Sequence, residues 1–165
     1  MDQNTLRSVQ APLKETYRTD PAAAVVTLSA FGDLGADQSC SVQTGQALVA
    51  AGLHPATGGD GSFACSGDML LQALVACAGV TMMAVATSLG LQVAGTVHAD
   101  GDLDFRGTLG VDREAPVGFS AIRLSFDLRT DATDDEVATL LQLTERYCVV
   151  FQTLRTPPTL DASMA

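Results

Sequence analysis

An almost unbroken apolar run, LLQALVACAGVTMMAVATSLG, occupies residues 70–90 and carries Cys77 near its middle. Its length alone would allow it to cross a membrane, because a span needs about 20 mostly apolar residues. It has no flanking Trp or Tyr, however, and no Lys or Arg lies between Arg18 and Arg106 to anchor or orient a span. We therefore predict a soluble helix that is buried on nearly all sides, with no membrane partner.

The composition of the chain is that of a globular protein. Its 165 residues are 47% hydrophobic and 17% charged, which predicts a single domain over residues 1–165. The net charge is −10 and Lys14 is the only lysine, so a nucleic-acid partner is not expected, because binding phosphates needs clustered cations. The N-terminal stretch MDQNTLRSVQ has no apolar segment of the kind found in secretory signals, which predicts a cytoplasmic protein.

Short apolar or alternating segments lie on both sides of the long run. They predict strands at residues 22–32, 38–44, 46–52, 93–105 and 119–129. In the last of these, apolar residues at every second position alternate with charged or polar ones, as in an antiparallel strand with one face in solvent. A Gly- and Pro-rich loop is predicted at 52–62, directly before the long helix at 66–89.

A second helix is predicted near the C-terminus. Thr133 and Glu136 form a T-x-x-E capping box, and the apolar spacing that follows places Cys148 on the inward face of one continuous helix that ends before the TPP at 156–158. The order of elements indicates an α+β domain with helices packed on an antiparallel sheet. Because a 24-residue helix that is apolar all round is hard to cover within 165 residues, we expect a homodimer in which a second chain supplies part of its cover.

The four cysteines are Cys40, Cys65, Cys77 and Cys148, and their spacing matches neither a CxxC redox pair nor a zinc site. No metal and no other cofactor is therefore expected. Cys77 and Cys148 have two interpretations, because buried cysteines are often inert packing residues, whereas two neighbouring thiols can reduce a peroxide and close a disulfide.

Reactivity would require Cys77 to be deprotonated at neutral pH. The dipole of its own helix acts only within the first turn, whereas Cys77 lies about three turns beyond the predicted N-cap, so an external cation is predicted to be necessary. The candidates for this role are Arg18, Arg146, Arg155 or another distant arginine, in this chain or its partner, with His54 and His98 as substitutes.

Two segments together resemble the paired cysteine motifs of the OsmC/Ohr family: SGDMLLQALVACAGVTM at residues 66–82 and ERYCVVFQTL at residues 145–154. The resemblance implies an intertwined α+β homodimer with the long helix of each chain at its centre. It also implies that Cys77 is the peroxidatic cysteine and Cys148 the resolving one, with an organic hydroperoxide as substrate and a dithiol as reductant. Cys40 and Cys65 match no family position and are interpreted as structural.

A non-catalytic function stays open beside this one. In that case the chain is an OsmC-like dimer that binds an apolar small molecule in a pocket between the long helices, and the cysteines serve only in packing.

Overall fold

The structure is a computed structural model that describes residues 2–5, 8, 11, 19, 31–34, 40–44, 47–110 and 112–164. The chain divides into two compact units. Unit 1 comprises Met1–Glu15, Ala73–His98 and Ser125–Ala165, and unit 2 comprises Thr16–Gln72 and Ala99–Leu124. That residues 1–165 form one domain stays a prediction.

Unit 2 contains a four-stranded sheet with strand order β1-β2-β3-β4. The strands are β1 (Phe31–Leu34), β2 (Cys40–Thr44), β3 (Ala47–Gly52) and β4 (Ala64–Cys65). The first three pair antiparallel, and the two-residue β4 pairs parallel to β3. The predicted strands at 38–44 and 46–52 are confirmed as β2 and β3. Most of the predicted strand at 22–32 lies outside the described residues, and only its last two residues fall in β1.

The predicted loop between β3 and β4 contains one tight turn, the 3-10 helix η2 (Pro55–Thr57). His54 caps this turn, because its ring nitrogen Nδ1 accepts a hydrogen bond from the Ala56 N–H at 3.0 Å. Gly59 allows the chain to return close to its start, since a Cβ atom there would lie 1.8 Å from the carbonyl oxygen of Leu53. The loop is therefore a specific folded connection.

The long helix α2 (Ser66–Leu89) has the predicted bounds. Its buried side chains recur every four residues: Leu74, Ala78, Met82 and Ala86. On other faces Val80 is 73% and Met83 53% exposed. Within the described part of the single chain, neighbouring elements thus bury one stripe of α2, and burial on nearly all sides stays a prediction that requires the expected second chain. Among the described residues, α2 is the one helix whose length and apolar composition would also allow it to span a membrane.

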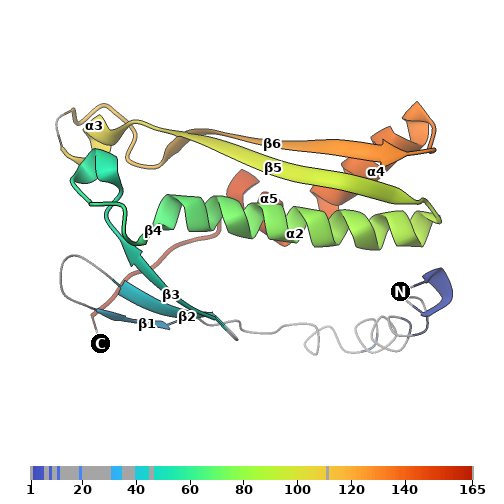
Figure 1. The fold of residues 1–165 in the computed structure, drawn as a ribbon, viewed down its shortest axis with the longest axis horizontal. Coiled ribbons are helices and arrows are strands. Elements are labelled where there is room, and N and C mark those ends of the chain that lie inside the picture. The colour runs from blue at the N-terminus through green and yellow to red at the C-terminus, as the bar shows by residue number, and fades with distance from the viewer. Residues whose placement is uncertain are drawn as a thin grey trace. The chain divides into compact units, whose positions relative to one another are not determined.

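Strands β5 (Val93–Leu103) and β6 (Phe119–Thr130) form a two-stranded sheet (Figure 1). The Ser120 hydroxyl donates to the carbonyl of Asp102 at 3.1 Å, and the Thr130 hydroxyl to that of Gln92 at 2.7 Å. The start of β6 therefore lies beside the end of β5, as in the predicted antiparallel pair. The predicted strand at 93–105 ends earlier, because Asp104 caps the short helix α3 (Phe105–Thr108) by accepting the Arg106 N–H at 3.0 Å.

The core of unit 1 joins α2 to helix α4 (Asp134–Tyr147). Met82 and Ala86 of α2 meet the fully buried Leu140 of α4. Partly buried apolar side chains surround this cluster, and they come from α2, the turn that follows it, both strands and α4: Val85, Leu91, Val93, Phe126, Leu128 and Leu141. The predicted packing of the long helix against an antiparallel sheet is confirmed, and so is the capping box of Thr133 and Glu136.

The predicted single C-terminal helix is in fact two helices. α4 ends at Cys148, whose backbone is extended with φ −72° and ψ 109°, and α5 (Val149–Arg155) begins directly after it. The Cys148 N–H donates to the Thr144 carbonyl, and the Cys148 carbonyl accepts from the Gln152 N–H, both at 2.9 Å. Cys148 therefore caps both helices, which allows the chain to turn there without leaving these groups unpaired.

Candidate functional site

Two thiols that are far apart in sequence come together in unit 1. Cys77 lies on α2 and is partly buried, whereas Cys148 lies between α4 and α5 and is only 1% exposed. Each thiol influences the pKa of the other through an interaction between the two side chains. We refer to Cys77 and Cys148 as the thiol pair. The prediction that Cys148 faces inward is confirmed.

Further hydrogen-bond donors surround the sulfur of Cys77. The backbone N–H groups of Val149 and Val150 and the side chain of Thr81 act on it as donors that lower its pKa. The two N–H groups belong to the first turn of α5, where backbone donors have no partner within the helix. Thr81 lies one helical turn beyond Cys77 on the same side of α2. Neutral groups of α2, of α5 and of the Cys148 side chain thus all act on the sulfur of Cys77.

The pKa values of the two thiols shift in opposite directions. Burial raises the pKa of Cys77, but the hydrogen bonds from the Val150 N–H, the Cys148 thiol, the Val149 N–H and Thr81 outweigh it, so that the net shift is downward. Burial also raises the pKa of Cys148, and the hydrogen bond and charge of Cys77 raise it further, against the backbone N–H of Phe151. Cys77 is therefore the thiol that ionises first, and Cys148 remains a proton donor to it.

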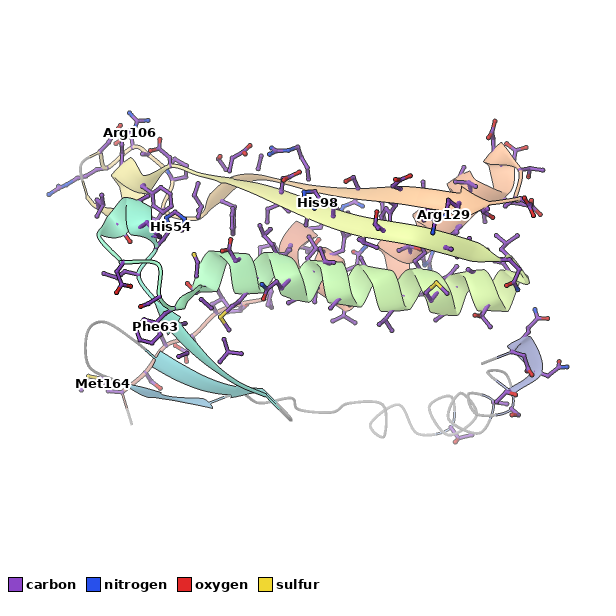
Figure 2. The ribbon with its side chains drawn as sticks, viewed as in Figure 1. His54, Phe63, His98, Arg106, Arg129 and Met164 are labelled. Carbon is purple, nitrogen blue, oxygen red and sulfur yellow. The ribbon has the colours of Figure 1, made fainter. Side chains whose placement is uncertain are left out.

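The groups of the described residues that lower the pKa of Cys77 are neutral, and an external cation at this thiol stays a prediction. The Arg146 guanidinium lies 5.7 Å from the centre of the Tyr147 ring, and His54 is stacked on Phe105 in unit 2. Arg18 lies outside the described residues. His98 is an exposed residue of β5 (Figure 2), and Arg155 is the last residue of α5.

Sequence reasoning missed the N–H donors of α5 because it treated residues 134–155 as one helix, in which these groups would have been bonded internally. Thr81 could have been found from the sequence, since residues four apart on a helix are neighbours. Thr81, which carries the hydroxyl, comes four residues after Cys77.

An open depression borders the other member of the pair. Its volume is about 660 Å³, and the segment 146–158 of α4, α5 and the following chain lines it. The lining includes Cys148 itself, the exposed Tyr147 and Val149, and the polar side chains of Gln152 and Thr153. A second molecule therefore has room to approach the chain next to Cys148.

Replacing the hydroxyl that binds Cys77 tests the origin of its low pKa. Thr81→Val keeps the shape of the side chain but removes a donor that lowers the pKa of Cys77, so this pKa is expected to rise. Less thiolate is then present at neutral pH, and alkylation of Cys77 by iodoacetamide should slow by roughly two- to tenfold, the factor of one ordinary hydrogen bond. Mass-resolved alkylation between pH 5 and 10 measures this.

Thr87→Val is the matched control, because the Thr87 hydroxyl lies on the same helix and donates to the Met83 carbonyl at 2.8 Å. Its alkylation profile should equal that of the unmodified protein. An unchanged profile for Thr81→Val would show that the hydroxyl does not influence the thiolate.

Comparison with known proteins adds a family model. The model described as OsmC-like protein matches residues 59–163, a segment that contains the whole of α2 and both members of the thiol pair. A search of the curated proteins finds no match.

Several solved structures are similar to this chain. An OsmC like protein from Mycoplasma pneumoniae has a TM-score of 0.68 at 15% identity, over 80% of this chain and 89% of that one. An organic hydroperoxide resistance protein from Elizabethkingia anophelis has a TM-score of 0.61 at 15% identity, over 81% and 91%. The organic hydroperoxide resistance protein OhrB of Bacillus subtilis has a TM-score of 0.53 at 17% identity, over 80% and 93%. The predicted α+β fold of the OsmC/Ohr type is confirmed.

Proposed function

Because the chain belongs to the OsmC-like protein family, we propose that it reduces organic hydroperoxides with its thiol pair, Cys77 as the attacking and Cys148 as the resolving cysteine. One observation carries this proposal: the buried Cys148 and the partly buried Cys77 interact within unit 1, and the pKa of Cys77 is lowered while that of Cys148 is raised. Two proteins with a similar fold are named organic hydroperoxide resistance proteins, which supports the choice of substrate.

In the first proposed step, the Cys77 thiolate attacks one oxygen of the hydroperoxide ROOH. An S–O bond forms, the O–O bond breaks, and the leaving alkoxide takes up a proton to become the alcohol ROH. Cys77 is then a sulfenic acid, oxidised by two electrons. In the second step the Cys148 sulfur attacks the Cys77 sulfur, an S–S bond forms, and water leaves.

An external dithiol completes the cycle by thiol–disulfide exchange, which returns both cysteines to thiols and leaves the reductant as a disulfide. The open depression beside Cys148 supports a route for this reductant. We place the reaction in the cytoplasm, where a disulfide in a resting protein would not persist.

The surroundings of Cys77 support an organic substrate over hydrogen peroxide. Along the helices that hold Cys77 and its donors, Val80 of α2 and Val150 of α5 have apolar side chains, which offer no charge to a polar ligand. Transfer of an apolar R group from water to such a surface is favourable, whereas hydrogen peroxide has no apolar group to bury. The N–H groups of α5 favour the negative charge on the sulfur.

The proposal includes a homodimer that covers the open side of α2. Val80 and Met83 are large apolar side chains on this helix, and more than half of each is exposed in the single chain. A second copy of the chain would remove them from water through the same surface on both subunits, as in a two-fold dimer.

Treatment of the reduced protein with one equivalent of cumene hydroperoxide tests the chemistry. The expected product is a single disulfide between Cys77 and Cys148 in each subunit, identified by alkylation and mass-resolved peptides, with one equivalent of cumyl alcohol. Cys65 provides the internal control, because it should remain a free thiol. A Cys77 that stays reduced at neutral pH would contradict the proposal.

A further inference from the structure

We propose that unit 2 carries a second small-molecule site, which binds an uncharged and mostly apolar organic ligand beside His54 and Cys65. All the residues that line this pocket belong to unit 2, and neither member of the thiol pair is among them. The site is thus a further binding function and does not depend on the proposed peroxide chemistry. It also differs from a pocket between the long helices of two subunits, because one chain builds it.

The pocket has a volume of about 420 Å³, which is within the usual range for small-molecule sites. Three stretches of unit 2 build it: residues 52–57 around η2, residues 65–70 at the start of α2, and residues 103–119 between β5 and β6. Figure 2 shows His54 at the start of η2, next to α3 of the third stretch. Segments distant in sequence therefore meet around one cavity.

The lining indicates the class of ligand. Its large side chains are apolar: Leu53, Leu70, Leu103, Phe105, Val117 and Phe119. No Asp, Glu, Lys or Arg is among the described residues that line it. A charged ligand would lose its hydration without gaining an ionic partner, so the pocket favours an uncharged one.

His54 supplies the polar anchor of this site. Since its Nδ1 accepts the Ala56 N–H at 3.0 Å, the neutral ring carries its proton on Nε2 and presents an N–H donor there. The ring is stacked on Phe105 with the two centres 5.0 Å apart and 15° between the planes. The Thr57 hydroxyl also donates to the His54 carbonyl at 2.8 Å. The donor is therefore held in place before a ligand with an acceptor atom arrives.

The part of the pocket wall that the segment from β5 to β6 provides is also closely packed. A Cβ on Gly101 would lie 2.4 Å from the ring of Phe119, and one on Gly107 would lie 2.5 Å from the carbonyl oxygen of Pro116, so both positions pack closely as glycine. Outside the lining, the Arg106 guanidinium pairs with Asp104 at 2.6 Å and with Asp112 at 3.3 Å. The cavity is thus bounded by packed and paired groups.

Gly67 gives a way to reduce the pocket without damaging the fold. A Cβ there would lie 3.4 Å from the Phe119 ring, 3.5 Å from the Cys65 sulfur and 3.6 Å from Leu103, all of which line the pocket. These are ordinary van der Waals distances, so a methyl group would fit. Alanine is also the better helix former in α2.

The Cys65 thiol reports occupancy of the pocket. We suggest mass-resolved alkylation of the reduced protein by iodoacetamide, with 2-naphthol as an uncharged, mostly apolar probe that carries one hydroxyl. At ten times its dissociation constant, 2-naphthol is expected to slow alkylation of Cys65 about tenfold, because only the unoccupied fraction reacts. Alkylation of Cys77 in the same sample should keep its rate.

Gly67→Ala should need at least about tenfold more 2-naphthol for the same protection of Cys65, with a thermal unfolding midpoint no lower than that of the unmodified protein. Gly79→Ala is the matched control on the same helix, since its Cβ would meet only Val97 at 3.6 Å, outside the pocket, and it should leave protection unchanged. Absence of protection up to the solubility limit of the probe would overturn the inference. Equal protection in Gly67→Ala, or equal slowing at Cys77, would do so as well, since the probe would then act elsewhere.

Discussion

Cys77→Ser is expected to lower kcat/KM for cumene hydroperoxide by at least about a thousandfold, because a serine hydroxyl cannot form the anionic sulfur nucleophile on which the first step depends. The same donors that lower the pKa of Cys77 would then surround a neutral hydroxyl that has no tendency to ionise. The measurement is a steady-state assay that follows consumption of the hydroperoxide with dithiothreitol as the dithiol.

Cys148→Ser distinguishes the two roles. Its Cys77 should still react with one equivalent of hydroperoxide, and the sulfenic acid can be trapped with dimedone, but the disulfide cannot form and turnover should depend on direct attack by the external thiol. Cys65→Ser is the matched control, since this thiol lies in unit 2 and should not change the rate. If Cys77→Ser retained the activity of the unmodified protein, the thiol pair would not be the catalytic site.

Val80→Asp is expected to convert the proposed dimer to a monomer. In a two-fold interface each substitution occurs twice. Association would therefore have to bury two carboxylates against apolar side chains of the other chain. At micromolar concentration the mass measured by light scattering should fall to one half, and the midpoint of unfolding should become independent of protein concentration.

Gln142→Asp is the control for this experiment, because Gln142 is an exposed residue of α4 and the substitution adds the same charge. It should leave the mass unchanged. Val80→Ser is a milder variant in case the aspartate prevents folding, and it should raise the dimer dissociation constant without abolishing association. A dimer of unchanged stability in both Val80 variants would show that this face of α2 is not the interface.

The sequence was sufficient to predict the elements that have a strong local pattern. The bounds of α2 follow from an apolar run that ends at a glycine, and β6 follows from strict alternation between apolar and polar residues. The start of α4 is set by the capping box of Thr133 and Glu136. In each case a short-range interaction determines the structure, so the signal is present in neighbouring residues.

The break between α4 and α5 could not be predicted in the same way. Thr144, Cys148 and Phe151 keep helical spacing across it, so the periodicity does not show that the backbone of Cys148 is extended. The pocket beside His54 is also invisible in the sequence, because it is built from three separated stretches of unit 2. Both features depend on which segments pack together, and that information lies in the tertiary structure.

The position of Cys148 between two helices has a consequence for the lifetime of an oxidised Cys77. Backbone hydrogen bonds to Thr144 and Gln152 hold Cys148 from both sides. The position of its sulfur therefore changes mainly by rotation about one side-chain bond. Such confinement gives a neighbouring group a very high effective concentration, on the order of 10⁵ M or more in well-aligned cases. A sulfenic acid on Cys77 would then be consumed by its own chain before millimolar thiols in solution could reach it, and overoxidation would have little time to occur.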